Sequence, residues 1–358
     1  MKQVSALELA CIVKELQSLL GSYVRKISQP DHTEITLELY TKEQGKNLLR
    51  IIPPHCLYLS SIRRASPPAA YNFCMSLRKR LNNARLQSIE QKDFERIVEL
   101  RFRKSEDFIL IIELFSKGNI ILTDSKYQII NVLMKKEWGF RTLKPQETYL
   151  YPKREGANPL LLHEEEFNNI IQHSDKDSIV KTLALNLSLG GIFAEELCAR
   201  AKLDKSKKEL EEEELKLLYQ KFDDIRGLNI SARFFKENAI PFPMMLSRHQ
   251  NFLSIPSFNK ALDMYYQQFM NKEEIEEEKK EDLELQKILE SQKKQIERFV
   301  EEGKKHKEAG DLIYSNYAEV KELLEKVKML KAKKYAWEKI EEELKVKIKD
   351  GQLILNLE

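Results

Sequence analysis

Cysteine is scarce in this 358-residue sequence, which has only four, and long apolar runs are missing. The four are scattered and form no Cys-x-x-Cys pair, so neither a disulfide framework nor a cysteine-based zinc site is supported. No run approaches the length that a membrane-spanning helix needs, and residues 1–20 lack the pattern of a secretory signal. We therefore expect a reducing, cytoplasmic compartment and no membrane partner.

Local signatures of catalysis are also missing. The six histidines show neither HxxxH nor HExxH spacing, so a metal hydrolase has little support. The sequence contains no GxSxG elbow, no Walker A loop and no GxGxxG fingerprint. We expect no metal, no cofactor and no enzymatic activity.

Charge is nearly balanced over the whole sequence but not locally. Lys and Arg number 60 against 57 Asp and Glu, a net charge of +3. Residues 60–104, in contrast, carry eleven basic and four acidic residues. A local excess of this kind is typical of surfaces that bind phosphate backbones. An ordinary solvated face is the alternative that charge alone leaves open.

The fold class expected from the residue pattern is α+β. Residues 1–155 predict a mixed α/β domain with an antiparallel or barrel-like sheet, because short strands follow one another with tight turns. Trp138 and the tyrosines of the whole chain are expected to fill core rather than to stack on bases. The expected helices span residues 7–20 and 71–82, and the expected strands 24–27, 34–40, 47–52, 96–102, 108–115 and 119–123.

Residues 156–240 predict a helical domain. Helical periodicity covers 178–189 and 192–201, and Leu189-Gly190-Gly191 interrupts it. Helix, tight glycine turn and helix form the pattern of a helix-hairpin-helix unit, in which Gly190 and Gly191 would let the backbone approach a phosphate. A helix end followed by an unrelated helix is the plainer alternative.

The rest of the chain divides at its last proline, Pro256. Prolines mark residues 241–269 as a return to extended structure, which we expect to pack on the N-terminal domain. Residues 270–350 predict a coiled-coil arm and tip, because apolar residues recur at alternating steps of four and three. Gly303 and Gly310 interrupt that pattern and predict a bend or short break. An alternating segment after Gly351 predicts a short strand.

Eight segments, taken in order, resemble the NFACT family of ribosome-quality-control factors, whose members also carry fibronectin-binding and nuclear-export-mediator labels. A close match is ELFSKGNIILTD, at Glu113–Asp124, to the family's ELFGKGNIILLD. MSLRKRL at Met75–Leu81 resembles LLRKHL, and QKDFERIVE at Gln91–Glu99 resembles the DRIV strand. The other five are Ser5–Leu16, Leu143–Tyr149, Leu189–Leu197, Phe258–Tyr266 and Ile313–Tyr317. The first helix is in the style of an archaeal member.

The resemblance implies a factor that binds large ribosomal subunits still carrying peptidyl-tRNA. It would hold an incoming tRNA and support untemplated, alanine-type tailing of the stalled chain, while the ribosome performs the peptide chemistry. The implied N-terminal fold is that of formamidopyrimidine-type DNA glycosylases. Base excision is not expected, because the sequence begins Met1-Lys2-Gln3 and lacks their Pro-Glu start. An adhesin-like interaction scaffold is the second alternative.

The resemblance also points to individual residues. The family's functional aspartate of the first helix and its Asp-Arg pair correspond to Glu8, Glu95 and Arg96, so that both acids are one methylene longer. A surface ion pair of little consequence is the alternative for Glu95 and Arg96. Arg78, Lys79 and Arg80 are expected to neutralise phosphates of tRNA or ribosomal RNA.

In the family, a returning helix and a C-terminal RNA-binding domain follow the region where this sequence stops. We therefore expect a shortened form in which the arm at residues 270–302 has no antiparallel partner. An apolar seam without a partner predicts fraying or self-association.

Overall fold

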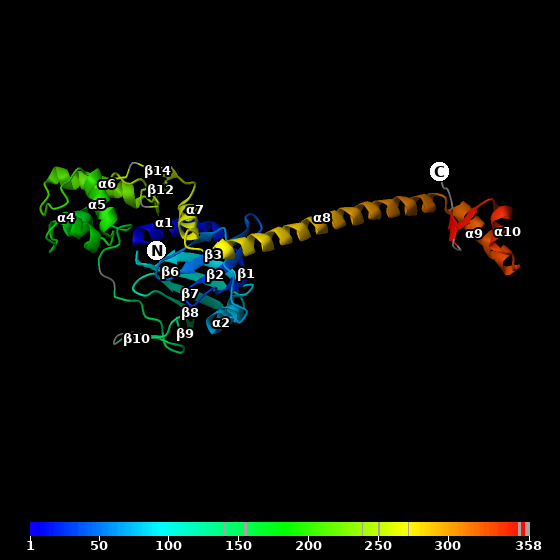
Figure 1. Cartoon of the computed structure of the whole chain (residues 1–358), viewed down its shortest axis with the longest axis horizontal. Helices are drawn as coiled ribbons and strands as arrows, with labels where there is room; N and C mark the ends of the chain where they lie inside the picture. The colour runs from blue at the N-terminus through cyan, green and yellow to red at the C-terminus, as the bar shows by residue number, and fades with distance from the viewer. Residues whose placement is uncertain are drawn as a thin grey trace. The chain divides into compact units, whose positions relative to one another are not determined.

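The computed structural model describes residues 1–138, 141–153, 156–237, 239–249, 251–270, 272–349 and 352–354, but not the side chains of Trp138, 272–283, Ile348 and Gln352 (Figure 1). The expectation for the Trp138 side chain thus lies outside the described residues. The chain forms two compact units, Met1–Glu278 and Lys279–Glu358. Helix α8 runs from the first unit into the second.

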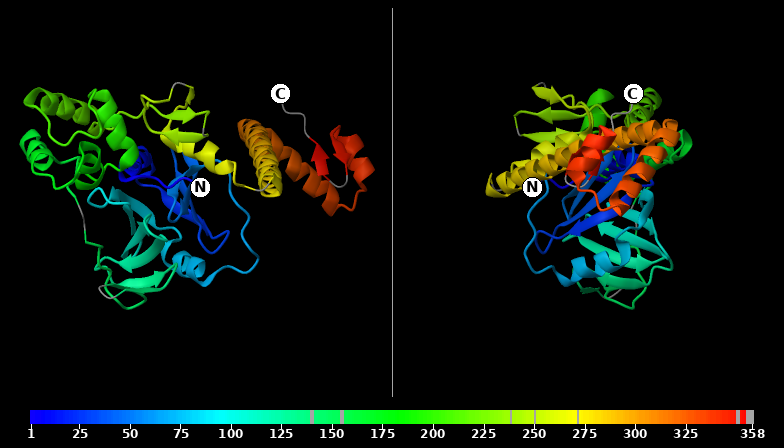
Figure 2. Two further views of the ribbon diagram at one scale, coloured as in Figure 1. Left: turned by 60° about the vertical axis from the view of Figure 1, so that its left-hand side comes forward. Right: turned by 90° about the vertical axis from the view of Figure 1, so that its right-hand side faces the viewer.

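The first unit is built on a nine-stranded antiparallel sheet in the order β4-β3-β2-β1-β5-β6-β7-β8-β9. Figure 2 shows the sheet, in blue to cyan-green, in two further views. All six predicted strands are present, and the predicted antiparallel sheet is confirmed. Three strands, β4, β5 and β9, were not predicted. The bounds are β1 Tyr23–Ser28, β2 Ile35–Thr41, β3 Gly45–Ile52, β4 Cys56–Ser60, β5 Arg85–Gln91, β6 Ile97–Arg103, β7 Asp107–Glu113, β8 Asn119–Asp124 and β9 Ile129–Val132.

Two helices of the N-terminal part confirm the predicted ones. Helix α1, Ala6–Leu16, begins at Ser5, and a short 3₁₀ turn, Gln17–Leu19, follows it before Gly21. Helix α2, Asn72–Leu81, buries Phe73 and Leu77 in the same apolar core as the sheet. A small hairpin follows β9, formed by β10, Lys136–Trp138, and β11, Arg141–Leu143.

A second apolar core lies among α3 Glu164–Gln172, α5 Gly191–Arg200 and α6 Glu212–Arg226. The predicted helix 178–189 is wrong in detail. Only Ile179–Lys181 is α-helical (α4), and Thr182–Asn186 forms a π-helical turn. The helix ends there because Ser188 has a φ of 54°, which a right-handed helix does not tolerate. A helix, a turn at Gly190 and helix α5 do follow one another, but the helix-hairpin-helix assignment stays a prediction.

The chain then returns to the sheet. A three-stranded sheet, β12 Arg233–Phe235, β13 Ile240–Phe242 and β14 Phe252–Ser254, leads to α7, Phe258–Gln267. The Glu15 carboxylate of α1 accepts hydrogen bonds from the backbone N–H groups of Phe258 (2.7 Å) and Asn259 (2.8 Å). The Asn259 side chain in turn accepts from Leu59 N–H of β4 at 2.9 Å. Helix α7 thus connects α1 to β4. The bounds 241–269 of this return segment remain a prediction.

The rest of the chain is mainly helical: α8 Lys272–Ser315, α9 Tyr317–Ala332, α10 Trp337–Leu344, β15 Lys347–Lys349 and β16 Gln352–Ile354. Of the predicted bend or short break at Gly303 and Gly310, the break is wrong, since α8 is continuous up to its end at Ser315 and Asn316 precedes α9. An exposed helical glycine costs only about 1 kcal/mol, which a long helix tolerates. Apolar side chains of α8 such as Phe299 (62% exposed) face solvent, so the coiled coil remains a prediction.

Candidate functional site

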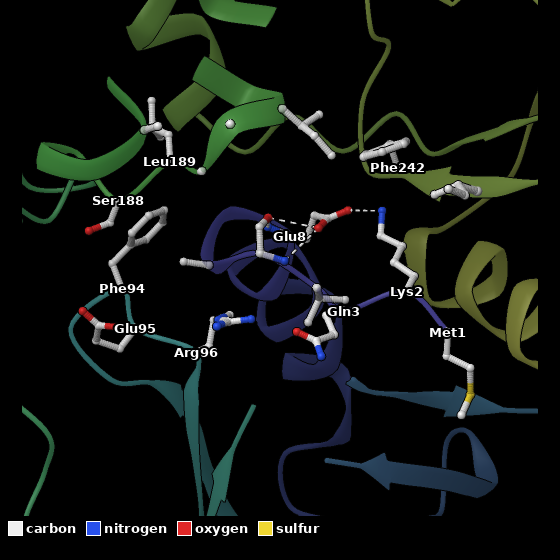
Figure 3. Close-up of a pocket in the computed structure, with 18 of the residues that line it drawn as sticks. Met1, Lys2, Gln3, Glu8, Phe94, Glu95, Arg96, Ser188, Leu189 and Phe242 are labelled. Atoms are coloured by element: carbon white, nitrogen blue, oxygen red, sulfur yellow. Dashed lines mark hydrogen bonds and ion pairs between the residues drawn. The ribbon is translucent and has the colours of Figure 1, made fainter. Parts of the chain in front are cut away.

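A cavity of about 720 Å³ lies between the start of α1, the β5–β6 turn and the start of α5 (Figure 3). These three segments come from distant parts of the sequence. The walls carry Lys2 and Glu8 from the first segment, Glu95 and Arg96 from the second, and Gly190 and Gly191 from the third. The cavity thus collects both signs of charge and an exposed stretch of backbone.

The wall at α1 is fixed by a capping box. Ser5 Oγ accepts from the backbone N–H of Glu8 at 3.3 Å, and Glu8 Oε2 accepts from the Ser5 N–H at 2.8 Å. This arrangement satisfies two backbone donors that helix formation leaves open. It also holds the Glu8 carboxylate in one place, with only 3% of the residue exposed.

The second oxygen of Glu8 pairs with Lys2. Lys2 Nζ lies 2.5 Å from Glu8 Oε1, donates to the Pro241 carbonyl at 2.7 Å and sits 3.6 Å from the Phe242 ring centroid. Burial lowers the pKa of Lys2, and the neighbouring Glu8 carboxylate opposes that shift. Glu8 is therefore a buried acid that is held by a cation, and it anchors the N-terminal segment to β13.

The opposite wall is a tight turn of unusual composition. Asp93 and Phe94 both have positive φ, 47° and 59°, and Glu95 N–H bonds to the Lys92 carbonyl at 2.7 Å. Two positive φ values in succession are typical of type I′ hairpin turns, which favour Asn and Gly. This conformation costs Phe94 about 1–2 kcal/mol. Burial of its ring, 2% exposed in the helical core, offsets that cost.

The turn is also bonded to α1. Gln91 Nε2 donates to the carbonyl of Ala6 at 2.9 Å and to that of Glu95 at 3.0 Å. The contacts of Gln91 and Phe94 together fix the positions of Glu95 and Arg96. Both of these residues precede β6, so the Glu-Arg pair lies in the turn and not in the strand that was predicted to begin at Arg96.

Arg96 is the half-buried cation of the cavity. Burial lowers its pKa, and the Glu95 carboxylate opposes the shift. Among the residues that the structure describes, its guanidinium has no hydrogen bond or ion pair. Figure 3 shows its side chain reaching toward the start of α1 from the turn. A guanidinium in this setting is suited to a ligand carboxylate or phosphate.

The third wall is the start of α5. Gly190, with a φ of 74°, is the residue before the helix, and no side chain of the described residues caps it. A Cβ atom built on Gly190 or Gly191 would meet no described atom within 4 Å. A ligand can therefore approach this backbone closely, and the first N–H groups of a helix favour anions.

Five of the eight predicted site residues thus meet at one cavity: Glu8, Glu95, Arg96, Gly190 and Gly191. The other three, Arg78, Lys79 and Arg80, lie on the last turn of α2 and line a separate, shallow hollow. Arg78 is partly structural, because its Nε donates to the Ile27 carbonyl at 2.8 Å. Within the described ranges, no group of three or more His, Cys, Asp and Glu is arranged to hold a metal ion.

Sequence reasoning missed Lys2 and Phe94. A single lysine at position 2 belongs to no recognisable sequence motif. A phenylalanine is not expected at a left-handed turn position, which favours Gly, Asn or Asp. The expectation that tyrosines fill the core is wrong for five of the described ones, which are exposed: Tyr23, Tyr40, Tyr314, Tyr317 and Tyr335. Tyr58 and Tyr266 are buried, but Tyr23 and Tyr40 are 47% and 38% exposed.

No described helix is both long enough and apolar enough to span a membrane.

Relatives of known designation cover most of the chain. "Archaeal Rqc2 homolog aRqcH" of Methanocaldococcus jannaschii is 31% identical over 92% of the chain and 53% of its own length. "Ribosome quality control complex subunit NEMF" of Homo sapiens is 25% identical over 94% of the chain and 35% of its own length. The chain therefore spans about half the length, or less, of these relatives.

A solved structure shares the fold. The N-terminal part of the fibronectin/fibrinogen-binding protein from Streptococcus suis superposes with a TM-score of 0.64 at 25% identity, covering 74% of this chain and all of that one. The family model for NFACT N-terminal and middle domains matches residues 5–350, nearly the whole sequence. The chain therefore belongs to the NFACT family.

Proposed function

We propose that the protein is a ribosome-associated quality-control factor that binds tRNA and large ribosomal subunits still carrying peptidyl-tRNA. In this proposal it acts in the cytoplasm and supports untemplated, alanine-type tailing of the stalled chain. The names of the relatives support the quality-control role. The tRNA and tailing steps rest on the resemblance of the motifs around Glu8 and Glu95-Arg96.

One observation carries the proposal: the three motif segments converge on one cavity. Arg96 has no partner among the described side chains, and the start of α5 offers backbone donors beside it. Together they suit an RNA phosphate, and the Glu95 carboxylate can accept from the donor edge of a base. Glu8 acts indirectly in this proposal, since its carboxylate is taken up by Ser5 and Lys2.

The peptide chemistry belongs to the ribosome in this proposal. The chain's residues bind and orient RNA, and no step requires a nucleophile or a proton relay from the cavity. The α2 cations Arg78, Lys79 and Arg80 supply a second contact to phosphates, away from the cavity. Such a contact raises affinity without reading sequence.

The test is cosedimentation with isolated large subunits, with and without a trapped peptidyl-tRNA. We expect the wild-type protein to sediment preferentially with the obstructed subunits. Arg96→Ala should weaken retention about tenfold, because a charge-assisted contact contributes roughly 1.5–3 kcal/mol. Arg248→Ala is the matched control: it removes the same charge from an exposed arginine that is outside the cavity and pairs with Glu195. Equal retention of both variants would contradict the site assignment.

A further inference from the structure

A row of polar and aromatic side chains crosses five strands at the end of the sheet opposite the cavity. The strand register sets each member directly opposite the next: Lys46 faces Tyr40, Tyr40 faces Tyr23, Tyr23 faces Arg85, and Arg85 faces Arg103. We call this set the tyrosine row. It runs over β3, β2, β1, β5 and β6 in that order.

All members of the row lie on one face of the sheet, because directly opposed residues of antiparallel strands point the same way. Each of them is exposed, including Tyr23 (47%) and Tyr40 (38%). Neighbouring strands are about 4.8 Å apart, so the two tyrosines are adjacent aromatic platforms. The two exposed rings, on directly opposed residues, offer aromatic surface that a partner can cover.

The row is also cationic. Lys46, Arg85 and Arg103 belong to it, and Arg25 lies with its guanidinium carbon 5.2 Å from the Tyr40 ring centroid. Asp107 of β7 lies directly opposite Arg103 of β6 and forms an ion pair with it. Glu38, two residues before Tyr40 on the same face, pairs with Arg63 at 3.7 Å. The cations along the row therefore outnumber the carboxylates. This charge favours an anionic partner over an apolar or basic one.

We propose that the tyrosine row is a binding surface for single-stranded RNA. Bases would stack on Tyr23 and Tyr40, and the flanking cations would contact the phosphates on either side. Aromatic residues on adjacent strands of an exposed antiparallel sheet, combined with basic neighbours, are how several RNA-binding modules hold unpaired nucleotides. A duplex would meet only the cations, since its bases are already stacked on one another.

This surface is separate from the cavity. Arg85 begins β5 and Arg103 ends β6, whereas the turn with Arg96 joins the other ends of the same strands. Seven residues of strand separate the two ends by about 20 Å. The proposal therefore does not depend on the cavity or on a ribosomal role, and each is tested by its own variants.

The experiment measures binding of the full chain to two labelled RNAs by fluorescence anisotropy. One is an unstructured U-rich strand of about ten nucleotides, within the range that such surfaces cover, and the other is a fully paired hairpin. Tyr23→Ala with Tyr40→Ala should raise the Kd for the single strand at least tenfold, since each missing stack is worth about fivefold or more. The Kd for the hairpin should stay within about twofold.

Two controls separate stacking from folding and from charge. Tyr23→Phe with Tyr40→Phe keeps both rings and should bind as wild type. Tyr314→Ala with Tyr317→Ala removes two exposed tyrosines of the second unit and should change neither Kd. Wild-type affinity of the double alanine variant for the single strand, or equal losses on both RNAs, would overturn the proposal.

Discussion

At the scale of single residues, the buried pair of Lys2 and Glu8 is the centre of the cavity's architecture. Both side chains are almost fully buried, at 8% and 3% exposure, and each has further partners besides the other. Burying two charges is costly, and the attraction between them compensates only when both are present. The pair therefore fixes the N-terminal segment against α1 and β13 only as long as both partners remain.

Lys2→Met should lower the free energy of unfolding by about 3–5 kcal/mol, because it leaves the Glu8 carboxylate buried without its cation. Adding Glu8→Gln should recover more than half of this loss, since a neutral amide can keep hydrogen bonds to Ser5. Urea denaturation of both variants and of Glu8→Gln alone gives the coupling energy. A loss below about 1 kcal/mol for Lys2→Met would show that the pair is not structurally important.

The four cysteines are buried free thiols. Burial raises the pKa of Cys11 to about 12 and that of Cys198 to about 11, so both are neutral at pH 7.5. Since the thiolate is the reactive form, we expect slow modification by a thiol-specific disulfide reagent in the native protein and complete modification in denaturant. Rapid reaction of the native protein would contradict the described burial.

At the scale of elements, the β5–β6 turn shows why a local rule can fail. Sequence reasoning placed a strand from Arg96 and found no turn signal at Asp93-Phe94, because Phe almost never occupies a left-handed position. Burial of the Phe94 ring in the helical core overrides that local preference. The information that fixes this turn lies in residues far away in the sequence.

Asp93→Gly should stabilise the protein by about 1 kcal/mol, because glycine adopts a positive φ without the penalty that aspartate carries. Phe94→Gly at the next position should instead destabilise it, since it relieves the same strain but removes a buried ring, a change that costs about 3–5 kcal/mol. Thermal unfolding of the two variants compares them directly. Destabilisation by both would mean that the conformation of the turn is not the strained part.

Helix α8 offers a matched pair of glycines. No described atom lies within 4 Å of a Cβ built on Gly303 or Gly310. Gly303→Ala and Gly310→Ala should each stabilise the helix by about 1 kcal/mol, as expected for exposed interior positions. Hydrogen exchange of residues 295–315 should slow in both variants. Unchanged exchange in both variants would contradict the assignment of these glycines to exposed interior positions of one continuous helix.

At the scale of the whole molecule, the first unit has extensive cores, whereas the described part of the second buries only Val327 and Ile340 of its apolar residues. Limited trypsin digestion should therefore cleave first in the exposed arm at residues 284–315 and leave a resistant fragment that ends before it. Simultaneous digestion of both units would contradict this division.

Because apolar side chains of α8 are exposed, we still expect the protein to self-associate through this helix. Light scattering over a concentration series should show an average mass that rises with concentration. A constant monomer mass, together with slow hydrogen exchange along the arm, would contradict it.

The sequence predicted much of the N-terminal fold, because its strands and helices have strong local patterns. It also named five residues of the cavity: Gly190 and Gly191 from the interrupted helical pattern, and Glu8, Glu95 and Arg96 only through family motifs. It did not separate the α2 cations from the cavity, nor reveal Tyr23 and Tyr40 as neighbours. The first fact depends on where α2 packs against the sheet, and the second on strand register, which pairs residues of different strands.

The most direct test of the central claim is the salt dependence of tRNA binding by the wild-type protein and by the variant that combines Arg78→Ala with Arg96→Glu. Wild-type affinity should fall steeply with rising salt, because cations of the first unit replace counterions on phosphates. The double variant should bind more weakly and show a shallower slope, by about one for each phosphate that it no longer neutralises. Salt-independent binding, or wild-type affinity in the variant, would contradict the account.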